Sequence, residues 1–207
     1  MSDNQEHINT IQDIRNLMEK STRFISLSGM AGVFAGVYAL GGALAFYLKF
    51  HSISYEQILI NVDSKQLFNF LLPVGLLVVF LSLATALILS LRKQNGSKMQ
   101  LFNVAARRLL LNLMIPLISG GLFVLFLMLQ GYYKILPPSL LVFYGLALIH
   151  GSKYTLEDIR YLGYFEVVIG LLNLYTQNYS LIFWCLGFGA LHIIYGLIMW
   201  NKYDRKQ

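Results

Sequence analysis

Long apolar runs separated by short polar segments dominate the chain from residue 24 onward. Their lengths approach the roughly 20 residues that an α-helix needs to cross a hydrocarbon core about 30 Å thick. The first three runs cover 24–48, 68–91 and 109–130. The fourth follows Pro137 and Pro138, which suit a helix N-terminus, and ends near residue 154. The fifth follows the TLED segment and ends near 176, and the sixth covers 180–200. The pattern therefore predicts an all-α polytopic transmembrane bundle of six helices.

Composition supports this class of protein. Hydrophobic residues make up 57% of the chain, charged residues 13%, and the mean hydropathy is +0.59, which lies outside the range of ordinary soluble domains. A chain of 207 residues has room for several spans with short loops, so we expect a single membrane domain over 1–207, with the spans at 24–200 and a cytoplasmic tail at 201–207. The single cysteine, Cys185, excludes a disulfide framework and a thiolate zinc site.

Lysines and arginines predict the orientation, because they concentrate in cytoplasmic loops near the span ends. If the N-terminus is cytoplasmic, thirteen of the sixteen basic residues fall inside, and the exceptions are Lys49, Lys65 and Lys134. Both termini are therefore expected in the cytoplasm. Segment 1–23 carries Ile8, Ile11 and Ile14 on one stripe, which predicts a short amphipathic helix rather than a removable signal peptide.

Small residues recur on the faces of three predicted spans. Ser28, Gly32 and Gly36 fall at four-residue intervals, which favours close helix packing in lipid. A path for a solute lined by these glycines is the alternative interpretation. The full set of predicted packing glycines is Gly29, Gly32, Gly36, Gly163, Gly170, Gly189 and Gly196.

Polar groups at membrane depth are the strongest indication of a functional site, because such residues are costly in lipid and face protein or water. Glu166 and Asn173 share one face of the fifth helix with Gly163 and Gly170, and His192 lies between Gly189 and Gly196 on the sixth. Helices joined by a short loop are antiparallel neighbours, so Glu166 and His192 can meet. His150, near the cytoplasmic end of the fourth helix, lies at a comparable depth.

Several roles remain open for these polar groups. A buried hydrogen-bonded pair would fix the packing, with Arg160 or a tyrosine hydroxyl as a further partner of Glu166. An acid beside a histidine also suits a proton relay. Metal binding would use His150, His192 and Glu166, although no short ligand spacing supports it, and haem ligation by the two histidines is conceivable geometrically. We predict no cofactor and no metal.

The third predicted helix carries Asn112 and Pro116 on roughly one face. Pro116 removes a backbone donor and frees the carbonyl of Asn112, which predicts a kink. Interrupted helices often line substrate sites in transporters, so we include Asn112 among the candidate substrate or proton site residues. A kink without any functional role is the alternative.

The loop RKQNGSKMQLFNVAARR contains five basic residues and no acid. Such a loop is expected to contact anionic lipid head groups and to orient the protein, or else to bind an acidic cytoplasmic partner. Nucleic-acid binding is not implied, and association with a second copy of the chain is left open. The candidate lipid or partner surface consists of Arg92, Lys93, Lys98, Arg107 and Arg108.

The chain contains no phosphate-binding loop, nucleophile elbow or HExxH motif, so a conventional enzyme is disfavoured and no catalytic residue is assigned. The run IRNLMEKSTRFISLSGMAGVFAGVYAL resembles the beginning of a family of bacterial integral membrane proteins with six predicted spans and no assigned activity. The resemblance implies a location in the bacterial inner membrane. Its members are often encoded beside a small winged-helix regulator, which implies a sensing or transport role. A cytoplasmic regulatory protein is included among the candidate partners.

Three functional hypotheses follow. The chain moves or senses a small solute or a proton through a polar site between the last three helices, or it is a membrane scaffold that binds a cytoplasmic partner through its basic loop. An intramembrane metal hydrolase is a distant third. A water-accessible cavity that reaches Glu166 would favour a transporter, whereas solid packing there would favour a scaffold.

Overall fold

The computed structural model describes residues 28–50, 55–93 and 104–205, and these residues are helical apart from short turns. The predicted amphipathic segment at 1–23 and Lys98 lie outside them. The long helices are α2 (Gly29–Phe50), α4 (Ser64–Lys93), α6 (Val104–Leu129), α7 (Leu136–Gly151) and α8 (Asp158–Tyr175). The short elements are α3 (Tyr55–Asn61), η1 (Tyr133–Ile135), η2 (Ser152–Tyr154) and η3 (Gln177–Tyr179). The last helical stretch consists of α9 (Ser180–Trp184), η4 (Cys185–Leu191), α10 (His192–Met199) and η5 (Trp200–Asp204).

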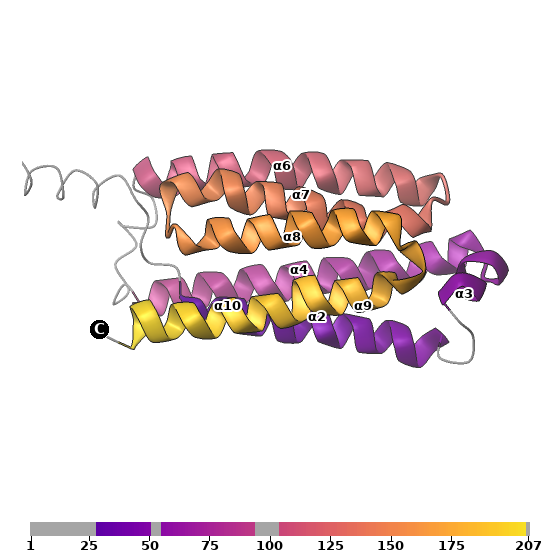
Figure 1. The fold of residues 1–207 in the computed structure, drawn as a ribbon, viewed down its shortest axis with the longest axis horizontal. Coiled ribbons are helices and arrows are strands. Elements are labelled where there is room, and N and C mark those ends of the chain that lie inside the picture. The colour runs from indigo at the N-terminus through magenta and orange to yellow at the C-terminus, as the bar shows by residue number, and fades with distance from the viewer. Residues whose placement is uncertain (1–27, 51–54, 94–103, 206–207) are drawn as a thin grey trace, which may run out of the picture.

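The long helices lie side by side in a bundle, as Figure 1 shows. Helix α7 packs between α6 and α8, while α2 packs between α4 and the α9–α10 stretch. The α9–α10 stretch also contacts α7 and α8 and so joins the two groups. Helices α4 and α6 each have one principal neighbour, and their other faces expose many large apolar side chains.

Five helices are long and apolar enough to cross a membrane, at Gly29–Phe50, Ser64–Lys93, Val104–Leu129, Tyr133–Tyr154 and Gln177–Asp204. Helix α8 is not one of the five. It carries Asp158, Arg160 and Glu166 within 18 residues, so it is less apolar than the others. Among the described residues, the coarse prediction of an all-α bundle of apolar helices is therefore confirmed.

The predicted starts of α7 and α8 agree with the structure, and one helix differs in its internal geometry. Pro137 and Pro138 lie in the first turn of α7, as predicted, and α8 begins at Asp158, the last residue of the TLED segment. Thr155 belongs to the turn that follows η2, where the backbone is extended. The sixth helix is continuous from Ser180, yet its residues 185–191 and 200–204 form wide π-helical turns that the sequence did not predict.

Two glycine seams allow close backbone contact between helices. In the first seam, a Cβ added at Gly29 would lie 2.6 Å from the Gly196 carbonyl oxygen, and one at Gly36 would lie 2.7 Å from that of Gly189. In the second, a Cβ at Gly163 would lie 2.7 Å from the carbonyl oxygen of Gly145. Side chains at these positions would push the helices apart, so the glycines set the spacing of α2 against α10 and of α7 against α8.

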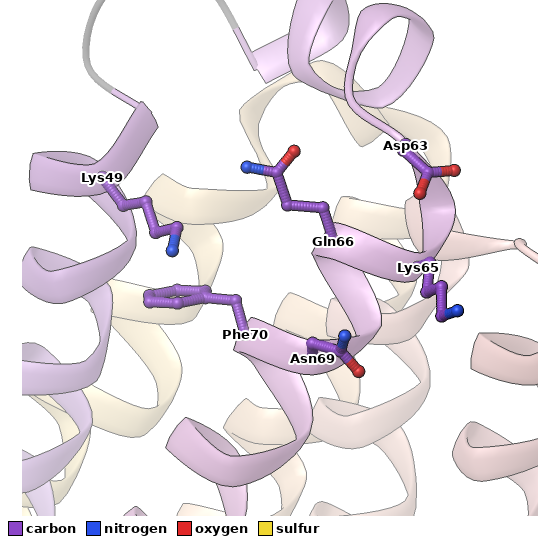
Figure 2. A pocket seen from close by; sticks show the side chains of 6 residues that line it. All are labelled: Lys49, Asp63, Lys65, Gln66, Asn69 and Phe70. Atoms are coloured by element: carbon purple, nitrogen blue, oxygen red, sulfur yellow. The ribbon is translucent and has the colours of Figure 1, made fainter.

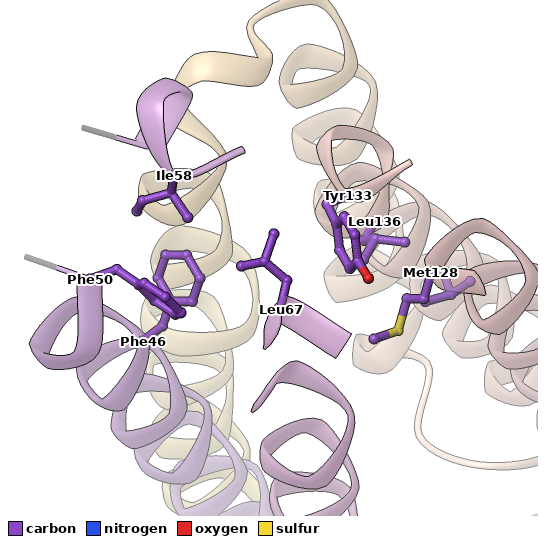
Figure 3. Close-up of a cluster of buried hydrophobic side chains, with 8 residues drawn as sticks. Phe46, Phe50, Ile58, Leu67, Met128, Tyr133 and Leu136 are labelled. Carbon is purple, nitrogen blue, oxygen red and sulfur yellow. The ribbon is translucent and has the colours of Figure 1, made fainter. Parts of the chain in front are cut away.

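A cluster of buried apolar side chains closes the end of the bundle near α3 (Figure 3). Leu67 of α4 lies among residues from α2, α3, α6 and α7, and only 1% of it is exposed. The nearby turn after α6 contains Gly131 with φ +82°, a left-handed conformation that favours glycine. The cluster consists of Phe46, Phe50, Ile58, Leu67, Val124, Met128, Tyr133 and Leu136.

Asp204 connects three helix ends at the opposite end of the bundle. Its Oδ2 accepts hydrogen bonds from the Ser28 hydroxyl at 3.0 Å and from the Gly29 backbone N–H at 2.9 Å, at the start of α2. Its Oδ1 lies 2.7 Å from the Lys93 ammonium, at the end of α4. One largely buried carboxylate therefore joins three helix ends and stabilises the N-terminus of α2.

Candidate functional site

Side chains from three helices converge in the middle of the bundle. Glu166 of α8 and His192 of α10 are brought together, and Tyr144 of α7 reaches the far side of the imidazole ring. Glu166 has no exposed surface and His192 only 4%, so the cluster is enclosed by protein. We call Glu166, His192 and Tyr144 the central polar cluster.

Hydrogen bonds indicate the tautomer of neutral His192. Its Nδ1 lies 3.0 Å from the carbonyl oxygen of Gly187, which can only accept a hydrogen bond, so Nδ1 carries a proton. Its Nε2 lies 2.8 Å from the Tyr144 hydroxyl. In neutral His192, Nε2 is therefore the acceptor and Tyr144 the donor. If Nε2 also gained a proton, the direction of this hydrogen bond would reverse.

Glu166 contacts His192 without a well-formed hydrogen bond. Its Oε1 lies 3.3 Å from Nδ1, which is within ion-pair distance, but the Nδ1 proton is directed at Gly187. Neither carboxyl oxygen of Glu166 has a hydrogen-bond partner of good geometry among the described residues. A buried carboxylate beside a neutral imidazole would carry an uncompensated charge, which is costly. Two arrangements avoid such a charge: a carboxylate beside a protonated imidazole, or a neutral carboxylic acid beside a neutral imidazole.

The π-helical element η4 forms the wall opposite Glu166. A Cβ added at Gly187 would lie 2.7 Å from Oε2 of Glu166, so only glycine leaves room for the carboxyl group there. The same residue provides the carbonyl that accepts from His192. Wide turns of this kind occur frequently at functional sites in helices. Gly187 thus shapes the space for Glu166 and orients His192.

Asn173 lies two turns further along α8, on the same buried face as Glu166. Its Oδ1 is 2.9 Å from the hydroxyl of Ser180, and both residues are fully buried. Tyr55 of α3 is a further partner of Ser180. Burial raises the pKa of the Tyr55 hydroxyl above its ordinary value, and the hydrogen bond with Ser180 opposes this shift. Asn173 therefore belongs to a separate polar group near α3.

Two predicted site residues lie away from the central polar cluster. His150 is exposed in the last turn of α7. Asn112 donates from Nδ2 to the carbonyl oxygen of Arg108 at 2.8 Å, within its own helix, and Pro116 lies inside the uninterrupted α6. Within the described part of the chain, no three His, Cys, Asp or Glu side chains gather, so the ligand set His150, His192 and Glu166 is not assembled.

The predicted basic surface lies at the end of the bundle where α2 begins. Arg92, Arg107 and Arg108 are exposed there, whereas Lys93 contacts Asp204. Eight of the eleven lysines and arginines in the described residues lie at this end, and we call it the basic end. The other three are Lys49, Lys65 and Lys134.

Two surface pockets lie at opposite ends of the bundle. The larger, about 350 Å³, lies between α2 and α4 near α3, and Figure 2 shows that the side chains of Asp63 and Lys65 point away from Lys49 rather than toward a common centre. The smaller, about 230 Å³, is lined by Lys93, Asp204 and residues around them. Neither pocket includes a residue of the central polar cluster, so neither gives access to Glu166.

Sequence reasoning missed Tyr144, Gly187 and Asp204. Tyr144 is one of thirteen tyrosines, and its spacing does not distinguish it from the others. Gly187 lies in the CLGFGAL segment, and only the π-helical turn directs its carbonyl at His192. Asp204 is the only acid in the basic tail NKYDRKQ, which was a usable signal.

No family model, curated protein or solved structure matches this chain.

Proposed function

We propose that the chain is a six-span protein of the bacterial inner membrane that binds a proton at Glu166 and His192 and couples it to the movement or sensing of a small solute. Helix α8 is the sixth span in this proposal, with its charged start at the basic end and Glu166 turned toward protein. The basic end lies in the cytoplasm, in agreement with the bias of lysines and arginines.

The observation that carries the proposal is the buried carboxyl group without a hydrogen-bond donor of good geometry, 3.3 Å from an imidazole nitrogen. A group that served packing alone would be expected to have its hydrogen bonds satisfied. A site that gains and loses a proton instead needs partners that suit both states. His192 and Tyr144 provide this, because the hydrogen bond between them can run in either direction.

The proton-binding step can be tested with the full-length protein in detergent or liposomes. Trp184 contacts Phe188, which in turn lies beside His192, so its fluorescence reports on the imidazole. In a Trp200→Phe background, we expect a pH titration to change this fluorescence as the central polar cluster gains or loses its proton. Glu166→Gln should remove or displace the transition. The exposed Glu157 offers a matched control, and Glu157→Gln should leave the transition unchanged.

A different result would reject the proposal. If Glu166→Gln and the Trp200→Phe background give the same pH profile, Glu166 takes no part in proton binding, and the central polar cluster is a packing device.

A membrane scaffold is the second candidate function. The full burial of Glu166 and the exposure of Arg92, Arg107 and Arg108 favour it. An acidic cytoplasmic partner or anionic lipid head groups would then bind the basic end. Replacing the three arginines with glutamine should weaken sedimentation with phosphatidylglycerol liposomes or capture of an acidic partner. If the chain is a scaffold, its Glu166→Gln variant should retain full function. If it is a proton-linked protein, the same variant should not.

A further inference from the structure

Asn173 and Ser180 form a buried polar group that the central polar cluster does not use. Both are fully buried between α8 and α9, at the end of the bundle near α3. The Ser180 hydroxyl lies 2.9 Å from Oδ1 of Asn173 and 2.7 Å from the carbonyl oxygen of Gln177. A hydroxyl has one proton, so it cannot donate to both oxygens at once.

The amide of Asn173 resolves this conflict only in part. If the amide is turned by half a rotation, Nδ2 donates to Ser180 and Ser180 donates to Gln177, but Oδ1 is then without a donor. In the other orientation Nδ2 has no partner among the described residues. One polar atom of a fully buried amide is therefore unsatisfied in either case. Buried amides of this kind normally bind a water molecule.

Leu141 of α7 separates this group from Glu166. Its side chain is fully buried, and its Cδ2 would lie 2.4 Å from a Cβ added at Gly187, the residue that also contacts the Glu166 carboxyl group. Its Cβ would lie 3.1 Å from a Cβ added at Gly170, which lies between Glu166 and Asn173 on α8. Seven residues of helix place Asn173 about 10 Å from Glu166 along the axis. An apolar side chain thus fills the interval between two polar groups on one helix face.

We infer that Asn173 and Ser180 bind water and that Leu141 is the apolar barrier which controls proton passage between this water site and Glu166. The proton would enter from the α3 end, where the Tyr55 hydroxyl contacts Ser180, and would move as hydronium along water when Leu141 swings aside. No bond other than those to the transferred proton is made or broken. This inference rests on the proposed function, because it assigns the route to the same proton site.

Stopped-flow pH jumps distinguish proton binding at Glu166 from the control of proton passage by Leu141. In the Trp200→Phe protein, the amplitude of the Trp184 signal reports proton binding, and its rate reports access. Leu141→Ala should raise the rate at unchanged amplitude, and the smaller truncation Leu141→Val should raise it less. Leu146→Ala on the exposed face of α7 is the control, because it lies away from the proposed route, and its rate should equal that of the parent protein.

The water site is tested in the same assay. Asn173→Leu removes the amide with little change in size and should slow the pH-jump response about three- to tenfold, the factor that corresponds to the net contribution of one hydrogen bond. The slowing should persist in the double variant with Leu141→Val. Circular dichroism and thermal unfolding identify variants that fail to fold, and the conservative Leu141→Val keeps the test available if Leu141→Ala does not fold.

Each outcome has one meaning. Equal rates for Leu141→Ala, Leu141→Val and Leu146→Ala would overturn the barrier, and an unchanged rate for Asn173→Leu would overturn the water site. Both results leave the proposed function intact as long as Glu166→Gln abolishes the amplitude. Loss of the Glu166 dependence itself would instead reject the proposed function.

Discussion

The Tyr144 hydroxyl lies 2.8 Å from Nε2 of His192, and this contact joins α7 to α10 across the interior of the bundle. It occupies the one imidazole nitrogen that neither Gly187 nor Glu166 approaches. The ring of His192 is therefore held from both sides, and α7, α8 and η4 all contribute a partner. This arrangement makes the orientation of His192 depend on three helices at once.

Tyr144→Phe should lower the free energy of unfolding by about 1–3 kcal/mol, because a buried Nε2 would lose its hydrogen bond. Denaturant unfolding in micelles measures this loss. Tyr164→Phe on the exposed face of α8 is the control and should have almost no effect. Nitrogen NMR of labelled histidine should also show a greater fraction of the alternative tautomer in Tyr144→Phe. An unchanged tautomer ratio would contradict the assignment of Tyr144 as the donor.

Gly196→Ala should destabilise the bundle by about 1–3 kcal/mol, the usual cost of overpacking a tight contact. The added Cβ would lie 2.6 Å from the Val33 backbone nitrogen and 2.8 Å from the Gly29 carbonyl oxygen, and backbone atoms cannot move aside cheaply. Gly41→Ala on α2 is the matched control, since no atom lies within 4 Å of its added Cβ. The melting temperature of Gly196→Ala should be well below that of Gly41→Ala. Equal melting temperatures would exclude a tight seam.

Asp204→Ala should destabilise the protein by about 1–3 kcal/mol, because a largely buried carboxylate loses hydrogen bonds to Ser28, Gly29 and Lys93. The ion pair of Lys202 with Asp158 is more exposed, so Lys202→Gln should have a smaller effect that salt reduces further. Unfolding measured at low and high ionic strength distinguishes the two pairs. If Lys202→Gln destabilises the protein more than Asp204→Ala does, the contacts of Asp204 are not the main stabilising interactions at this end.

The orientation of the bundle can be measured by cysteine labelling in intact cells. In a Cys185→Ser background, Lys65→Cys should react with a membrane-impermeant maleimide, because the α3 end is expected outside. Arg92→Cys at the basic end should react only after the cells are opened. Both positions are exposed in the structure, so a difference in labelling reports the side of the membrane. The opposite pattern would show that the chain is inserted the other way round.

The apolar runs predicted the helices well because length and hydropathy act locally along the chain. Helix α8 is the instructive exception, since its charged residues lower its hydropathy although it packs closely against α7. The start of α8 at Asp158 agrees with the TLED segment that marks it, whereas η2 and the turn between α7 and α8 were not predicted. Such turns depend on how neighbouring helices meet.

The meeting of Glu166 with His192 could be anticipated, because each lies on a glycine-containing face of two consecutive antiparallel helices. The role of Tyr144 could not, since it comes from α7 and is recognised only once three helices are positioned together. The same holds for the carbonyl of Gly187, which is directed at His192 by a wide helical turn. His150 shares the chemistry of His192 but faces outward, and its spacing alone gave no sign of this.

Helix α4 has a consequence for how the protein fits its bilayer. Its 30 residues make it about 45 Å long, half as long again as a hydrocarbon core of about 30 Å. Most of its surface is open to the surroundings, and its side-chain hydrogen bond to α2 joins Thr85 to Tyr38. A thinner membrane would therefore tilt α4 more than the rest of the bundle and strain its contact with α2. Shorter lipid chains would then disturb the packing of α4 without moving the helices around Glu166.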